Sequence, residues 1–452
     1  MNAEQPVAGT TVTTATDDGA SELAVTSGPQ DSLEATAAPG DLLALPADAS
    51  LSQYIGAWAK RVRSGDSGVL PVIVGLIVIV IIFQTQSSVF LSAANLTNLL
   101  TQGAPFVMLG MAEVFVLLLG EIDLSIGYSG AVGAAVMTIL AYQPINFGWG
   151  LAIAAGLATT AGIGFLQGQL ITRLRLPSFV VTLAGLLFWE GFLIWIINNQ
   201  SPSNGGSIRI LNTVIHNIIY GTVSPTVSWI AMVVGVAVFA ILTLRRDRRR
   251  AASGLVAPPI RLTAIKIAGM AAAGIVLVAI CNTNRGVPGG FVIRGVPWVV
   301  PIVLAFVVCW TFLLNRTRFG RYVYAIGGNS EAARRAGINV RRTRVLAFTL
   351  AGFTAAAGMI IYASRLGSMS SDVDGGQIVL YAVAAAVIGG ASLFGGRGKM
   401  VHALLGGIVI ATIYNGMGLL DLSSAVQYMV TALVLLAAVT VDAVSRRGST
   451  AS

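Results

Sequence analysis

The chain has 452 residues, of which 55% are hydrophobic and 10% charged, and its mean hydropathy is +0.80. Soluble domains carry about 25% charged residues, so this composition excludes an ordinary water-soluble protein and predicts one embedded in a membrane. The net charge of +9 does not indicate nucleic-acid binding, because the basic residues gather in short segments between apolar runs.

The first 68 residues differ from the rest of the chain. Residues 1–50 hold eight acids and no Lys or Arg. Such a segment cannot bury enough apolar surface to offset its ordering entropy, so we predict a disordered acidic tail. It also lacks the basic start and compact apolar core of a signal peptide. Residues 51–68, with Trp58, Lys60 and Arg61, are amphipathic and predict an interfacial lead-in to the first span.

Apolar runs of nearly membrane-spanning length then follow one another to residue 442. They predict an all-α, polytopic membrane helix bundle with about twelve spans, and they leave open whether each glycine-rich run is a straight or a broken helix. The runs lie near 69–85, 99–119, 124–142, 148–170, 178–197, 226–244, 262–281, 298–314, 345–364, 378–394, 401–420 and 425–442.

The distribution of positive charge tests this threading. With the amino terminus inside, all but four of the 28 basic residues fall on the inner side. The four exceptions are Arg209, Arg285, Arg294 and Arg365. Because cytoplasmic loops carry an excess of Lys and Arg, we predict a multi-pass protein of the plasma membrane with both termini cytoplasmic.

The most basic segment is 315–344, which holds eight arginines and one acid, Glu331. Its middle predicts a short capped helix. Asn329 or Ser330 can accept the first free backbone N–H, Glu331 suits the positive helix start, and Gly337 suits the stop. Two interpretations remain open: the loop fixes topology by its charge alone, or it is a docking surface on which another protein pushes.

Polar side chains inside the apolar runs are candidates for a polar pathway, since such groups at membrane depth usually face protein or water. The candidates are Gln102, Glu113, Gln167, Gln169, Glu190, Asn415 and Gln427. Glu121 and Asp123, between two runs, have a second interpretation, as caps of the helix that follows them.

No catalytic, metal or cofactor site is expected. A phosphate-binding loop needs Gly-Lys-Ser/Thr after a spaced first glycine, whereas Lys399 is followed by Met400 and Leu393 stands where that glycine should be. Cys281 and Cys309 lie in or beside apolar runs, and His216 and His402 are far apart. Transport driven by ATP would therefore need an ATPase on another chain.

Three blocks, 120–127, 320–338 and 387–398, resemble motifs of the permease subunits of bacterial ABC importers for monosaccharides, the ribose/xylose/arabinose permease family. The motif residues are Gly120, Asp123, Leu124, Ser125, Gly127, Gly389, Gly390, Gly395 and Gly396. Glu121 departs from the pattern, where the family usually has Gly. The extra loop and span near 245–296 is most similar to the xylose-type branch. The resemblance implies a ten-span permease core plus two extra spans.

The resemblance implies partners. A second permease copy would complete the path, a cytoplasmic ATP-binding subunit would dock on it, and an external sugar-binding protein would deliver a monosaccharide, such as xylose. The segment 315–344 would then be the coupling loop of a permease domain spanning 69–447. Its coupling residues would be Arg321, Asn329, Ser330, Glu331, Ala332, Arg334, Arg335 and Gly337.

Other functions remain open from the sequence alone. A permease for branched-chain amino acids or nucleosides would be distantly similar. A secondary transporter would need no ATPase, but more often shows paired ion-relay acids within its spans. An integral-membrane enzyme would need a catalytic cluster at a membrane face, which the sequence does not offer.

Overall fold

The structure is a computed structural model that describes Gly56 and residues 70–450, apart from 143–144, 202–204, 255–257 and 287–289. The predicted acidic tail, and the lead-in except for Gly56, lie outside the described residues. The helices are α2 (Leu70–Gln86), α3 (Ala93–Leu117), α4 (Ile126–Ala141), α5 (Trp149–Leu174), α6 (Ser178–Gln200), α7 (Thr213–Tyr220), α8 (Pro225–Ala252), α9 (Ile260–Asn282), α10 (Val299–Arg316), α11 (Arg318–Gly328), α12 (Ser330–Arg335), α13 (Val340–Leu366), α14 (Gly375–Ile388), α15 (Met400–Leu419) and α16 (Ser424–Thr450).

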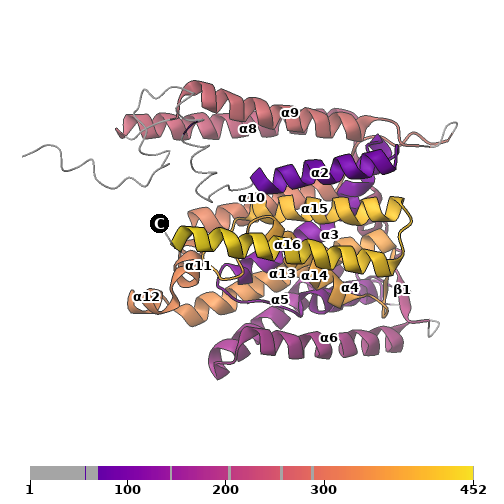
Figure 1. Cartoon of the computed structure of the whole chain (residues 1–452). Helices are drawn as coiled ribbons and strands as arrows, with labels where there is room; N and C mark the ends of the chain where they lie inside the picture. The colour runs from indigo at the N-terminus through magenta and orange to yellow at the C-terminus, as the bar shows by residue number, and fades with distance from the viewer. Residues whose placement is uncertain are drawn as a thin grey trace, which may run out of the picture.

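Most of these helices lie roughly parallel to one another, as expected of a membrane bundle (Figure 1). Within the described residues, eight are long and apolar enough to cross a membrane: α3, α5, α6, α8, α9, α10, α13 and α15. Shorter apolar helices are α2, α4, α14 and the 424–434 part of α16. The mainly helical polytopic bundle is thus confirmed, and the count of about twelve spans stays a prediction.

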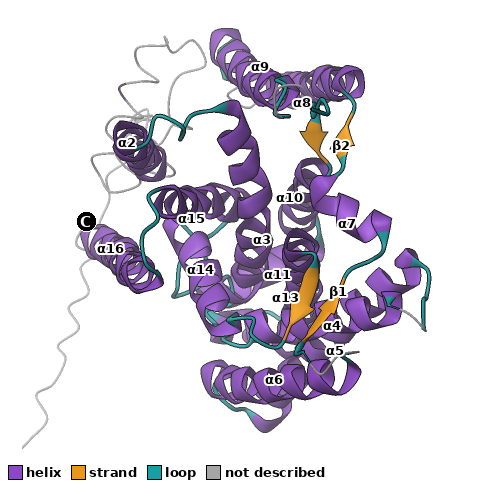
Figure 2. Cartoon of the chain, turned by 90° about the vertical axis from the view of Figure 1, so that its right-hand side faces the viewer, coloured by secondary structure: helices purple, strands orange, loops and turns teal. Residues whose placement is uncertain are grey.

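Four short strands qualify the all-α prediction. Strand β1 (Ser207–Arg209) pairs antiparallel with β4 (Ser368–Ser370), and β2 (Thr222–Val223) pairs antiparallel with β3 (Val296–Pro297). Both pairs lie at the end of the bundle that faces the viewer in Figure 2. They join connections that are far apart in the sequence, so no local pattern predicted them.

The helices differ strongly in how deeply they are buried. In the 18-residue apolar stretch of each helix, 89% of the residues are buried for α3 and 72% for α13. For α8 and α9 the share is only 11% each. Figure 1 accordingly places the α8–α9 pair along the upper edge of the bundle. The α8–α9 pair is therefore peripheral, and α3 and α13 form the centre.

Glycine permits a close helix contact between α5 and α13. A side chain at Gly164 would clash with the carbonyl of Phe348, and one at Gly352 would clash with the carbonyl of Thr160. Such small residues let helix backbones approach each other in a membrane. Gly162, two residues before Gly164 in the same helix, instead faces open space.

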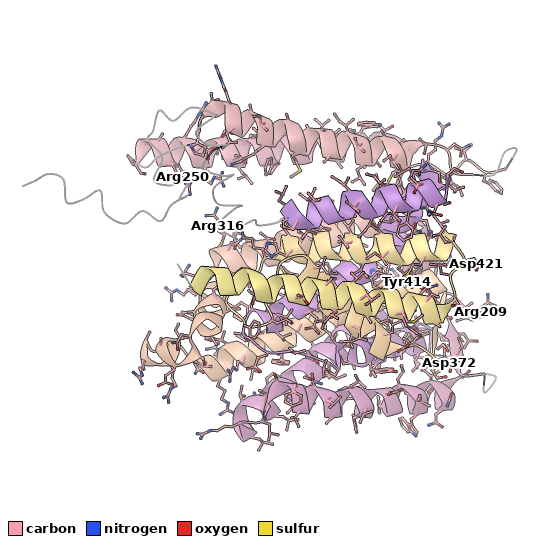
Figure 3. The ribbon with its side chains drawn as sticks, viewed as in Figure 1. Arg209, Arg250, Arg316, Asp372, Tyr414 and Asp421 are labelled. Atoms are coloured by element: carbon pink, nitrogen blue, oxygen red, sulfur yellow. The ribbon has the colours of Figure 1, made fainter. Side chains whose placement is uncertain are left out.

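The two ends of the bundle carry different charges. Figure 3 places Arg250 and Arg316 at one end, and Arg209, Asp372 and Asp421 at the other. The end with Arg250 also holds α12 and the C-terminal end of α16 (Figure 1). This arrangement agrees with the sidedness that the sequence predicts.

Candidate functional site

The basic segment folds into two short helices between α10 and α13. The Thr317 hydroxyl accepts the backbone N–H of Gly320 and caps α11. Asn329 Oδ1 accepts the backbone N–H of Ala332 at 2.9 Å and caps α12. Gly337 follows with φ of +81°, a left-handed conformation that favours glycine. The predicted capped helix is therefore confirmed, with Asn329 rather than Ser330 as its cap.

Helix α12 presents its charges outward. Glu331 accepts hydrogen bonds from Arg334 at 2.8 and 3.0 Å and from Arg335 at 3.1 Å, and all three side chains are exposed. The bonds from Arg334, and then those from Arg335, lower the pKa of the Glu331 carboxyl. Ala333, on the opposite side, is buried. The helix is thus a shaped, charged projection at the edge of the molecule (Figure 1).

The three sequence blocks that carry the resemblance meet at one point. The backbone N–H of Gly396 donates to the carbonyl of Leu118 at 3.0 Å. The hydroxyl of Tyr324, on α11, donates to the carbonyl of Gly398 at 2.7 Å. A side chain at Gly327 would clash with the carbonyl of Leu118. The connections α3–α4 and α14–α15 therefore pack directly against α11. Only the capping residue Asn329 separates α11 from α12.

Backbone conformation explains why glycine occupies several positions in the blocks 120–127 and 387–398. Gly120, Gly395 and Gly396 have φ of +74°, +84° and +72°. Residues with a side chain rarely adopt these angles, so glycine is required for the tight connections to form. Gly127 and Gly389 are required for another reason, because a side chain would clash with the carbonyls of Gly375 and His402.

Asp123 orders the start of α4. Its Oδ1 accepts from the backbone N–H of Ser125 at 2.9 Å and from the Ser125 hydroxyl at 2.7 Å. Gln167, from α5, donates to the same hydroxyl at 2.7 Å. Asp123 thus holds Ser125, the residue before α4, and no side-chain cap bond is made at the start of that helix. Glu121 makes a different contact, an ion pair with Arg344 on α13 at 3.1 Å.

The candidate pathway residues fall into separate places. Asn415 donates to Gln102 at 3.0 Å and to Asn95 at 3.0 Å, forming a buried amide cluster between α3 and α15. Glu190, on α6, accepts from the hydroxyl of Tyr128 at 3.0 Å.

The remaining candidates make local contacts. Gln169 accepts from Arg341 at 3.3 Å, and Gln427 donates to the carbonyl of Leu422 at 2.8 Å. Glu113 is fully buried, and neither of its carboxyl oxygens has a hydrogen-bond partner within the described part of the chain. The structure brings together Gln102 and Asn415 and separates the other candidates.

Sequence reasoning missed a group at the start of α14. Asp374 Oδ1 accepts the backbone N–H of Gln377 at 2.8 Å, and the Gln377 amide donates to the Tyr381 hydroxyl at 2.8 Å. The Tyr428 hydroxyl, from α16, donates to Asp374 Oδ2 at 3.4 Å. The signal was present in the sequence as Asp-Gly-Gly-Gln, a capping residue followed by Gln three positions later.

Nothing in the described ranges is arranged as a metal centre: no group of three or more His, Cys, Asp or Glu side chains comes together there. Both cysteines are free, Cys281 buried and Cys309 exposed. The functional features are therefore polar clusters inside a helical bundle and a charged projection at one end. A bundle with these features is typical of a multi-pass membrane transport component.

Comparison with known proteins defines the family. The model of the family described as "Branched-chain amino acid transport system / permease component" matches residues 95–439. The xylose transport system permease protein XylH of Escherichia coli K12 is 34% identical over 408 residues, covering 89% of this chain and 99% of that protein. Its counterpart in Haemophilus influenzae is 32% identical over 396 residues, covering 86% and 99%.

The ribose import permease protein RbsC of Escherichia coli K12 is 29% identical over 374 residues, covering 82% of this chain and 92% of that protein. No solved structure matches this chain. The chain belongs to this family of transport-system permease components. The resemblance to xylose and ribose permeases that the three blocks indicated is thereby confirmed.

Proposed function

We propose that this chain is the membrane permease subunit of an ATP-driven importer for a monosaccharide, with a pentose such as xylose as the foremost substrate. The observation that carries the proposal is the 34% identity to a xylose permease along 89% of the chain. In such a system the chain is a transport component, and ATP hydrolysis belongs to a separate ATP-binding subunit.

Coupling to that subunit falls to the segment 315–344. Its exposed charges on α12, with Arg321 on α11, offer a shaped surface to a cytoplasmic partner. The direct packing of α11 on the connections α3–α4 and α14–α15 supports a mechanical role, because a push on α11 reaches two membrane helix pairs at once. ATP-driven movement of the partner would then tilt these helices and open the path alternately to each side.

The path itself needs a second copy of this chain and an external sugar-binding protein. The bundle would cross the membrane about twelve times, with both termini cytoplasmic. Segregation of arginines at the end that holds α12 supports this orientation (Figure 3). We place the path among Gln102, Glu113, Gln167, Gln169, Glu190, Asn415 and Gln427. Neutral, hydroxyl-rich sugars suit amide and carboxylate side chains rather than a strong charge field.

The decisive experiment measures uptake of labelled xylose, ribose and leucine by cells that express the chain with its ATP-binding and sugar-binding partners. Saturable pentose uptake, with copurification of an ATP-binding subunit, is the expected result. Uptake of leucine alone would instead favour the branched-chain amino acid function that the family's description names. Pentose uptake without any ATP-binding partner would favour a secondary transporter.

The coupling assignment has its own test. The double variant Glu331→Lys with Gly337→Pro should abolish uptake while the protein remains in the membrane, because it removes the α12 ion pairs and the left-handed turn that ends the helix. Normal uptake by this variant would remove α12 from the coupling surface.

A further inference from the structure

Two short helices of the bundle begin against each other. A side chain at Gly127, in the first turn of α4, would clash with the carbonyl of Gly375, the first residue of α14. The ring of Tyr128 packs on Gly375 from the same turn, since a Cβ atom there would lie 2.6 Å from the ring. These contacts join the amino-terminal ends of two helices that are far apart in the sequence.

The length of α14 sets the depth of this meeting point in the bundle. The 14 residues of α14 rise only about 21 Å, less than the roughly 30 Å of a hydrocarbon core. The far end of α14 leads into the α14–α15 connection, which packs against α11 at the end of the bundle that holds α12. The start of α14 therefore falls short of the opposite side of a hydrocarbon core of that thickness.

Polar groups from two flanking helices reach the meeting point. Glu190 lies near the middle of α6 and accepts from Tyr128. Tyr428, in the second turn of α16, donates to Asp374. Helix α16 contacts α14, α14 contacts α4, and α4 contacts α6. Four helices thus contribute to one polar group of side chains.

The group is not sealed inside this chain. Asp374 and Tyr428 are exposed, and Glu190 and Gln377 are half-buried. Each carboxylate also has an oxygen that is available to a ligand. Glu190 Oε2 has no side-chain partner among the described residues. Asp374 Oδ2 has only the long, 3.4 Å contact with the Tyr428 hydroxyl. Glu190 lies near the middle of the candidate span α6, and a carboxylate at that depth faces water or protein, because lipid cannot satisfy it.

We propose that Tyr128, Glu190, Asp374, Gln377 and Tyr428 form a hydroxyl-binding site for the transported monosaccharide. The set supplies two carboxylates that accept from sugar hydroxyls, an amide that both donates and accepts, and tyrosines that add hydroxyls and apolar ring faces. Such a mixture suits a neutral polyol, which needs many directed hydrogen bonds. The inference rests on the proposed function for the identity of the ligand, and on the structure for the location.

A purely structural role explains less of the geometry. Capping of α14 uses only Asp374 Oδ1, so it does not require Tyr428 to reach Asp374 from another helix. Glu190 stands at no helix end, so it caps nothing. Both flanking helices also expose large apolar residues, such as Phe188 at 62% and Leu433 at 66%, which a second copy can cover while the polar group between them stays hydrated.

The first test measures pentose uptake by the complete transporter in proteoliposomes. Asp374→Asn, Glu190→Gln and Gln377→Ala should each lower uptake by about tenfold, the effect of losing one good hydrogen bond to a substrate hydroxyl. ATP hydrolysis stimulated by the sugar-binding protein should stay close to that of the unaltered transporter. Asp372→Asn, two residues from Asp374 in the same exposed loop, is the matched control and should transport normally.

Uptake equal to that of the unaltered transporter in all three variants would overturn the site. If the unaltered transporter imports no pentose, the proposed function fails, and a second measurement still decides the location. Gln377→Cys, placed in a Cys309→Ala background, is treated in membrane vesicles with a water-soluble maleimide.

Rapid modification, slowed by xylose or by whichever substrate is imported, is the expected result. Leu187→Cys, one turn from Glu190 on α6 and 65% exposed, is the control for an apolar surface and should react slowly. If Gln377→Cys reacts no faster than this control, the group is not hydrated and the inference is wrong, whatever the substrate.

Discussion

Glu121 forms an ion pair with Arg344 at 3.1 Å that joins the connection between α3 and α4 to the first turns of α13. The side chains are only 12% and 29% exposed, so solvent screens the pair incompletely. In the permeases that this sequence resembles, the position of Glu121 is usually Gly. This chain therefore carries an added electrostatic link between a motif connection and the helix that follows the basic segment.

This ion pair predicts a charge-dependent effect. Arg344→Glu leaves two carboxylates together in a partly buried place and should destabilise the protein by about 1–3 kcal/mol, between the values for exposed and buried pairs. Exchanging the charges in the double variant Glu121→Arg, Arg344→Glu should restore most of the loss. Thermal unfolding of the purified protein measures both.

The control is Glu121→Gly, which introduces the residue usual in the resembling permeases and leaves Arg344 with access to water. It should cost less than Arg344→Glu. A double variant no more stable than Arg344→Glu alone would show that the two charges are not coupled.

The amide cluster predicts that Asn415 contributes to the stability of the bundle. Asn415→Leu removes a partner from both Asn95 and Gln102, leaving buried amide groups unsatisfied, and should destabilise the protein by about 1–3 kcal/mol. Gln169→Leu, whose amide contacts only Arg341 at an exposed position, is the comparison and should change stability little.

Measuring uptake beside thermal unfolding separates the two possible roles of Asn415. A variant that keeps its stability but loses uptake would place the amide in contact with the substrate. Loss of stability, with uptake reduced only in proportion to the folded protein, supports the structural role.

The left-handed turn after α12 predicts an unusual order among substitutions at Gly337. No atom would contact an added Cβ there, so space is not limiting, and the cost comes from the φ of +81°. Gly337→Ala should cost about 1–2 kcal/mol locally, whereas Gly337→Asn should cost less because Asn adopts this conformation more readily. Uptake should fall for the Ala variant and be largely kept for the Asn variant, as labelled-pentose assays will measure. Equal uptake in both variants would show that the geometry of this turn does not matter for transport.

The contact of α5 with α13 predicts a sharp difference between neighbouring glycines. Gly164→Ala places a methyl group against the Phe348 carbonyl and should force the helices apart, lowering stability by about 1–3 kcal/mol. Gly162→Ala, two residues away in the same helix, meets open space and should be neutral or slightly stabilising because Ala favours the helix. Thermal unfolding of the two variants tests the contact, and equal midpoints would contradict it.

The sequence by itself determined the features that depend on neighbouring residues. Hydropathy over about 20 residues identifies a membrane helix without reference to the rest of the fold, so the bundle and most helix positions could be predicted. The cap at Asn329 and the stop at Gly337 were equally local, because a capping side chain bonds to the backbone two or three residues away.

Only the tertiary structure decided which distant residues meet. Asn95 and Asn415, Glu121 and Arg344, and Tyr128 and Glu190 lie on different elements, and no periodicity in the chain relates them. Hydropathy also gave no preference between Gly162 and Gly164, because both are glycines in one apolar run, and only the position of α13 distinguishes them. In lipid every run is apolar, so the hydrophobic pattern that marks the buried face of a soluble helix is weak, and close packing between helices selects the partners.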